Sequence, residues 1–132
     1  MKKLSVALLL FIAMGNAHAC SCVLVTPAQA KGINDRAFVG QVTNVQNAQS
    51  PGKLAISFRI SDWIKGPREK ESVVLVPVSP AACGYGSPFF ILGTTYLVFA
   101  NQSGEYLETS ACSPNQMGRP SKKNLRVLRR GT

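Results

Sequence analysis

The residues best suited to do chemistry are Cys20-Ser21-Cys22, which directly follow Ala17-His18-Ala19. Small residues at positions 17 and 19 are what a signal peptidase requires before its cut. A cut after Ala19 would leave Cys20 with a free α-amine, and its reference pKa of about 8 leaves a useful neutral fraction at pH 7. The amine and the carbonyl oxygen of one residue can close a five-membered chelate on a metal ion. If disulfide bonds also hold Cys20, the sequence predicts a free amine fixed in place on the folded surface of the mature chain.

Residues 1–19 have the build of a signal peptide. Lys2 and Lys3 precede an apolar run from Leu4 to Met14 that is too short to span a bilayer. A retained anchor and a lipoprotein signal are the alternatives, and Ala17, where lipoprotein signals usually carry Leu, argues against the second. We expect a secreted or periplasmic protein with one domain, residues 20–132, and no membrane span in the mature chain. Loss of Lys2 and Lys3 leaves 13 basic and 6 acidic residues, a net charge of +7.

All four cysteines, Cys20, Cys22, Cys83 and Cys112, follow the predicted cut. An even number of cysteines behind a secretory signal indicates disulfide bonds formed outside the cytoplasm. A Cys20–Cys22 bond would close a very small, strained ring, so two pairings stay open: 20–83 with 22–112, or 20–112 with 22–83. Either one ties the N-terminus to the middle and late parts of the chain. A zinc site of four cysteines is the rival, and the oxidising compartment and the lack of histidine disfavour it.

The composition argues against most catalytic classes. The only histidine, His18, lies in the segment predicted to be removed, so the mature chain has no imidazole for Ser-His or Cys-His catalysis or for common metal centres. Paired cysteines offer no thiolate nucleophile. The acidic residues are scattered and most simply lie on the solvated surface. We therefore expect neither an enzyme nor a cofactor of the protein's own.

The apolar pattern predicts a series of short strands with a helix at each end. Thr26 as an N-cap, a following proline, and Gly32 as a terminator predict a short first helix. Gly40 predicts a bulge or bend in the first strand, and a last helix is expected from Ser121 to Arg130, ended by the next glycine. The expected strands are 37–45, 54–64, 73–78, 94–100 and 106–109, with a short apolar piece at 89–92. Because helices do not alternate with strands, the pattern favours a small antiparallel barrel or sandwich.

Several stretches, taken in order, carry a family resemblance. The start is Cys20-Ser21-Cys22, followed by Thr26-Pro27. The later stretches are Phe38 to Val42, Trp63 to Gly66, Ala82 to Gly84, Gly93 to Val98, and Ser110 to Cys112. Together they resemble the N-terminal, netrin-like domain of the tissue inhibitors of metalloproteinases, over nearly all of residues 20–132.

The resemblance implies a mainly β fold, a small five-stranded antiparallel OB-type barrel with short flanking helices. It also implies one of the two disulfide pairings, Cys20–Cys83 with Cys22–Cys112. The chain departs from the family in lacking a third disulfide and a second domain, with Lys31 and Gly32 where one of the missing cysteines would lie.

The resemblance also implies a function, inhibition of a zinc metalloproteinase. In that family the N-terminal residue chelates the zinc of the target protease through its amine and carbonyl, a role that falls here to Cys20. Ser21 would enter the specificity pocket beside the metal. We call the implied contact residues the wedge: Cys20, Ser21, Cys22, Val23, Leu24, Ala81 and Ala82. The zinc in this scheme belongs to the partner protease.

The alternative is a netrin-like binding module that inhibits nothing and recognises a protein partner or a polyanion. It would use a cluster of basic residues near the C-terminus, which otherwise forms a solvated helix face. The basic cluster consists of Arg119, Lys122, Lys123, Arg126, Arg129 and Arg130. Nucleic-acid binding is not expected, because a secreted, disulfide-bonded chain lacks evident stacking aromatics in a basic groove.

Overall fold

The computed structural model describes residues 20–130, so the predicted signal peptide and Gly131 lie outside the described residues. The elements in chain order are α2 (Pro27–Ile33), β1 (Arg36–Asn47), β2 (Lys53–Lys65), β3 (Glu71–Pro77), η1 (Pro80–Ala82), β4 (Thr95–Ser103), β5 (Tyr106–Glu108), β6 (Gln116–Met117) and α3 (Lys122–Arg129). Both predicted helices and all five predicted strands are present, whereas the apolar piece at 89–92 forms no strand. The 3-10 turn η1 and the two-residue strand β6 were not predicted. Over the described range, no helix has both the length and the apolar character needed to cross a bilayer.

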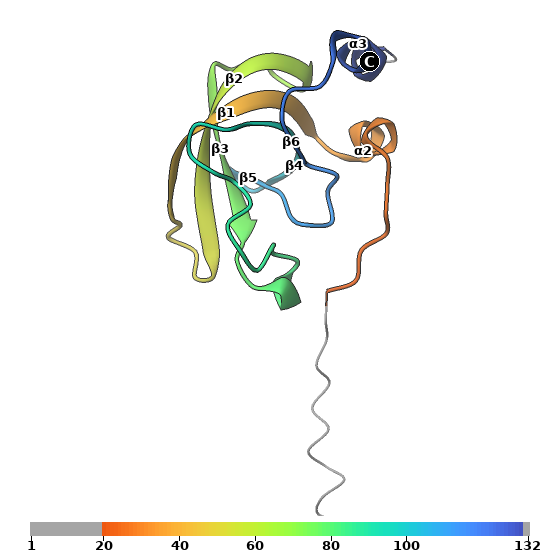
Figure 1. Ribbon diagram of the computed structural model, residues 1–132. Helices are drawn as coiled ribbons and strands as arrows, with labels where there is room; N and C mark the ends of the chain where they lie inside the picture. Colours follow the sequence, from red (N-terminus) through yellow and green to blue (C-terminus); the bar gives the residue numbers. More distant parts are fainter. Residues whose placement is uncertain (1–19, 131–132) are drawn as a thin grey trace, which may run out of the picture.

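Five of the strands close into a ring (Figure 1). The neighbours run β1–β2–β3–β5–β4, and β4 returns to pair with β1. The short strand β6 pairs with Tyr96 and Leu97 of β4, on the edge opposite β1. All pairings are antiparallel except that of β3 with β5, which is parallel and holds only Val74 to Leu107 and Leu75 to Glu108. The expected antiparallel pairing is thus present except at this one seam. Five strands cannot alternate in direction all the way round a closed ring, so one parallel seam is unavoidable.

The ring encloses the larger of two hydrophobic clusters. Alternate residues of β1, such as Phe38 and Val42, point into this cluster and are fully buried. Phe38 packs on Phe58 with ring centroids 5.4 Å apart. Trp63 lies at the edge of the cluster with its ring centroid 5.5 Å from that of Phe38, and its Nε1 donates a 2.6 Å hydrogen bond to the Glu69 carbonyl. The interior is therefore filled by aromatic and branched side chains, which makes the ring a rigid support.

The second cluster lies on the outside of the ring, beneath α2 and α3, which cover one side of it (Figure 1). Ala37 and Val39, the β1 residues that alternate with those of the interior, contribute to this cluster together with Leu125 and Leu128 of α3. β1 therefore serves two cores at once. A register shift between Val39 and Gly40 supplies the predicted bulge.

Helix α2 begins as predicted and ends differently. Thr26 forms a capping box with Gln29: its hydroxyl accepts from the Gln29 amide, and the Gln29 side chain accepts from the Thr26 amide. The prediction that Gly32 ends the helix was wrong, since the helix continues to Ile33. Asn34 caps it instead, because its buried side-chain amide donates a 2.7 Å bond to the Ala30 carbonyl. A local side-chain cap thus replaced the glycine signal.

Candidate functional site

Two disulfides fix the first described residues onto the ring. Cys20 is bonded to Cys83 and Cys22 to Cys112, each pair with its Cα atoms 5.1 Å apart. This is the pairing that the family resemblance implies. The bridges lie side by side, since the Sγ atoms of Cys20 and Cys112 are 3.6 Å apart. Residues 20–22 are therefore held from two directions, by the loop after η1 and by the loop after β5.

The same cysteines form a group that has the composition of a metal site. The sulfur atoms of Cys20, Cys22 and Cys112 lie within 4.8 Å of one another. All four cysteines are in disulfides, however, and none of those in residues 20–130 is free. Because a disulfide sulfur carries no thiolate charge, this cluster is a covalent clamp rather than a set of metal ligands.

The segment after the clamp exposes large apolar side chains. Ser21 is exposed, Val23 is 83% exposed and Leu24 is 95% exposed. Val25 then packs against the outer cluster and Thr26 begins α2. The segment is therefore fixed at both ends while its middle residues face solvent. Burying one such side chain is worth about 1.5–3 kcal/mol, so this exposure favours a partner that covers them.

The turn η1 forms a second exposed ridge beside the clamp. Ala81 and Ala82 are exposed, and Cys83 follows them with φ 64°, the only non-glycine residue with positive φ among the described residues. The Ser79 hydroxyl accepts from the Ala81 amide, and the Cys83 amide donates to the Pro80 carbonyl over 3.1 Å. The left-handed turn at Cys83 aims its sulfur at Cys20. The structure thus brings the ridge next to the N-terminal segment, as the wedge requires.

Gly84 allows the loop after η1 to pack directly against the backbone at the end of β3. It is buried, and a Cβ placed there would lie 2.6 Å from the Val78 carbonyl carbon and even closer to the Pro77 carbonyl oxygen. Its amide donates to the Ser79 carbonyl over 2.8 Å, and the carbonyl of Cys83 accepts from the Ala111 amide over 2.8 Å. Backbone packs directly on backbone here, which only glycine permits. The stretch Ala82 to Gly84 is part of the family resemblance, but neither η1 nor the left-handed Cys83 is predictable from the sequence, because no local rule favours them.

The basic cluster is divided by ion pairs. Ser121 caps α3, and Leu125 and Leu128 turn inward, so the cations of the helix face outward. Arg129 lies 2.9 Å from Asp62, and Arg119 pairs with the other oxygen of the same carboxylate. The sequence did not indicate these pairs, which join residues almost 60 or more positions apart.

Lys31 links the two helices. Its side chain is only 7% exposed, and its Nζ donates a 2.7 Å bond to the carbonyl of Arg130 at the end of α3. Lys65 in turn donates to the Lys31 carbonyl over 2.8 Å. Burial, and then the charge of Lys65, lower the pKa of Lys31 below its usual value. A charged side chain thus ties α2 to α3 at the end of the molecule that carries the basic cluster.

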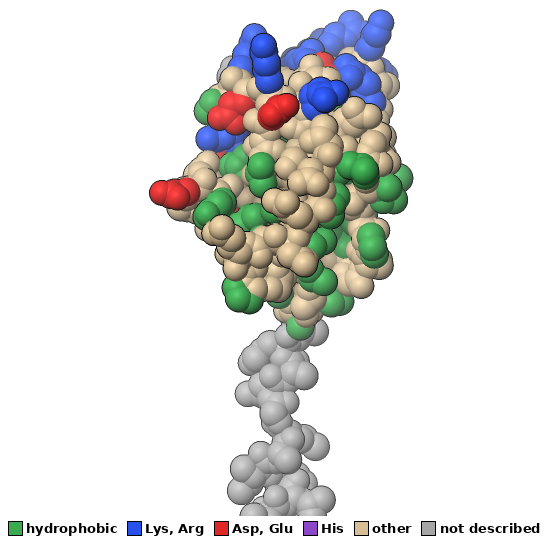
Figure 2. All heavy atoms as spheres, turned by 90° about the vertical axis from the view of Figure 1, so that its left-hand side faces the viewer, with side chains coloured by type: hydrophobic (Ala, Val, Ile, Leu, Met, Phe, Trp, Pro, Cys, Tyr) green, Lys and Arg blue, Asp and Glu red, His purple; other side chains and the backbone are tan. Residues whose placement is uncertain are grey.

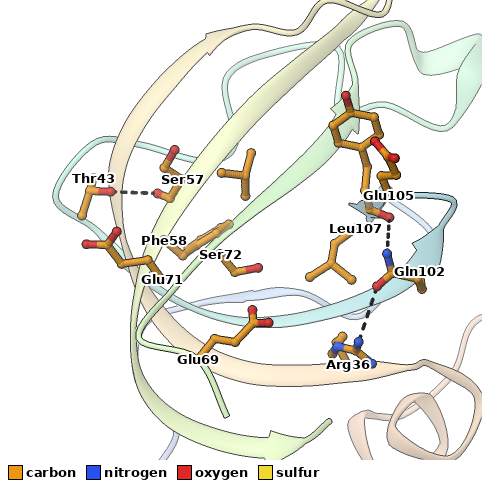
Figure 3. A pocket seen from close by; sticks show the side chains of 12 residues that line it. Arg36, Thr43, Ser57, Phe58, Glu69, Glu71, Ser72, Gln102, Glu105 and Leu107 are labelled. Atoms are coloured by element: carbon orange, nitrogen blue, oxygen red, sulfur yellow. Dashed lines mark hydrogen bonds between the residues drawn. The ribbon is translucent and has the colours of Figure 1, made fainter. Parts of the chain in front are cut away.

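The parallel seam of the ring borders an open hollow of about 440 Å³ (Figure 3). Glu69 and Glu71 lie on one bank and Glu105 on the other. Arg36 also lines it, with its guanidinium 3.4 Å from the side-chain oxygen of Gln102. These three glutamate side chains are long and flexible, and they lie at the rim of the open hollow.

A scan against protein-family models and a search of curated proteins both find no match for this chain. What the site can do must therefore follow from its own residues. Those residues are an extended segment clamped by two adjacent disulfides, two outward apolar side chains, and a rigid alanine ridge beside them.

Proposed function

We propose that the mature protein is a secreted or periplasmic inhibitor of zinc metalloendopeptidases. Its fold would be an OB-type barrel of the kind found in the tissue inhibitors of metalloproteinases. The observation that carries the proposal is the clamp: residues 20–22 are held by two neighbouring disulfides, while Val23 and Leu24 stay 83% and 95% exposed. A segment so constrained, yet so open to solvent, is suited to binding another protein with little loss of conformational entropy.

The chemistry of inhibition would reside in Cys20. Once residues 1–19 have been removed, its α-amine and carbonyl oxygen would occupy the open coordination position that catalytic zinc keeps for water or substrate. The bridge to Cys83 fixes the Cα of Cys20, so the two ligand atoms are already oriented before binding. The protein would supply no metal of its own, since the zinc is that of the protease.

The neighbouring residues would set the contact. Ser21 would enter the pocket beside the zinc, and its small size would suit pockets that a bulky side chain could not enter. Val23 and Leu24 would cover apolar surface along the protease cleft. Ala81 and Ala82, held by η1, would add a second line of contact without long side chains that need ordering.

The test compares three forms of the protein that differ only at the N-terminus. These are the mature form starting at Cys20, a form with one extra alanine before Cys20, and a form whose amine is acetylated. We expect the mature form to inhibit at least one protease of a zinc endopeptidase panel. Blocking the amine should raise the inhibition constant by about 100-fold or more, as loss of a central hot spot does. Mass analysis of the natural N-terminus comes first, because a cut elsewhere or a lipidated Cys20 contradicts the proposal.

Thermal unfolding of the three forms is the control, because an added residue should leave the fold unchanged. Equal inhibition by the extended and mature forms would mean that the amine does not bind the zinc. If no form inhibits any protease of the panel, the non-inhibitory binding module becomes the better explanation.

A further inference from the structure

The structure separates the basic cluster into two parts. Arg119 and Arg129 are held by Asp62, as described above. None of the other four cations forms an ion pair within residues 20–130, and all four are exposed. We call these four the basic face: Lys122, Lys123, Arg126 and Arg130.

The basic face is continuous because of the way α3 packs. Leu125 and Leu128 are buried against the ring, so the residues between and beyond them point to solvent. Lys122, Arg126 and Arg130 follow one another at four-residue spacing, about 6 Å apart along the helix axis. Like charges at this spacing repel each other, and that unfavourable arrangement is relieved when an anion lies over them.

The basic face lies far from the wedge. In Figure 1, α3 is at one end of the molecule, while η1 and the start of the described chain are at the other. Figure 2 shows Lys and Arg side chains gathered at the α3 end of the visible face. A ligand on the basic face therefore leaves Val23, Leu24 and the alanine ridge accessible.

We propose that the basic face binds a linear anionic polysaccharide and so retains the protein at an extracellular or envelope matrix. A row of cations one helical turn apart matches a polymer that carries about one charge for each sugar ring. A lipid surface is the poorer match, because the leucines of α3 are buried and only Val127, half exposed, is an apolar residue available for insertion. Binding would be electrostatic and would weaken as salt screens it.

The experiment measures the affinity of the mature protein for heparin, a defined anionic polysaccharide, by calorimetry at two salt concentrations. The double variant Lys123→Gln/Arg126→Gln removes two charges of the basic face. The matched control, Arg59→Gln/Lys70→Gln, removes two exposed charges outside α3. One cation near an anionic surface is worth about fivefold in affinity, so we expect a loss of about 25-fold for the first variant and less than about threefold for the control.

A third variant tests the division made by the ion pairs. Asp62→Asn removes the negative charge that Asp62 places on Arg119 and Arg129, and we expect it to raise the affinity for heparin. An unchanged or lower affinity would contradict the role given to Asp62. Circular dichroism of each variant shows whether the helix is intact.

Other outcomes would overturn the proposal. These are an affinity that does not fall with salt, equal losses in the basic-face and control variants, or binding to phosphatidylglycerol vesicles without binding to heparin. No protease enters this assay, so its result is independent of the proposed inhibition. The form extended before Cys20 should bind heparin as the mature form does, since the wedge is not involved.

Discussion

The two disulfides should contribute almost equally to stability, although they close loops of different length. Their cysteines are 63 and 90 residues apart, and a chain-entropy estimate for each bridge alone is about 4.3 and about 4.6 kcal/mol. With the other bridge present, however, either bond closes the same loop. That loop runs through the existing bridge and contains the residues from Cys20 to Cys22 and from Cys83 to Cys112, about 31 in all. Removing either bridge alone should then cost about 3.7 kcal/mol, and removing both about 8 kcal/mol.

The assay is urea unfolding of the oxidised protein, followed by far-ultraviolet circular dichroism. The variants are Cys20→Ala/Cys83→Ala, Cys22→Ala/Cys112→Ala, and the quadruple variant. Each single-bridge variant should lower the midpoint by roughly 2 M urea. The quadruple variant should be largely unfolded, since domains of this size have a stability of about 5–15 kcal/mol. A single-bridge cost below about 2 kcal/mol, or clearly different costs for the two bridges, would refute the shared-loop reasoning.

Two further predictions concern the loop that carries Cys83 and the aromatic residue next to it. Gly84→Ala should lower the free energy of unfolding by about 1–3 kcal/mol and weaken any inhibition, because the new methyl group presses on the backbone of Pro77 and Val78. Chemical denaturation measures this, and Gly32→Ala is the control, since nothing lies within 4 Å of a Cβ at that position. Burial raises the pKa of Tyr85 above 10, against a smaller opposing effect of the hydrogen bond from Asn115. The folded protein thus holds this phenol neutral, so its contribution to stability is present below pH 10 and is lost as the pH rises above 10. In a spectrophotometric titration Tyr85→Phe should remove a phenol that ionises above pH 10, and removal of a phenol that ionises at or below pH 10 would contradict the prediction.

The fold was predictable from the sequence where local patterns dominate. The alternation in Phe38 to Val42 marked β1, the Thr26 cap marked the start of α2, and Gly40 marked the bulge. The pattern failed at Gly32 because the helix is capped instead by Asn34, whose side chain donates to the Ala30 carbonyl four residues earlier. The parallel pairing of β3 with β5 was also not predictable, because it depends on the directions of all five strands in the ring.

The candidate site was predictable only in outline. The residues alone left two disulfide pairings open, and the family resemblance selected the one that the structure contains. The left-handed turn at Cys83 was not predictable, since cysteine seldom takes that conformation without a covalent reason. The ion pairs of Asp62 with Arg119 and Arg129 were also not predicted, because they join distant parts of the chain.

The positions of the two disulfide bonds along the chain affect how the folded protein withstands cleavage by a protease. The bonds join positions 20 to 83 and 22 to 112, so the two closed loops overlap from Cys22 to Cys83. A single cleavage anywhere between Cys22 and Cys112 leaves two fragments that are still joined by at least one bridge. The ring and its hydrophobic interior then keep those fragments docked. A protein with the proposed inhibitory function could therefore be cleaved in an exposed turn, such as residues 48–52, without losing the segment that begins at Cys20.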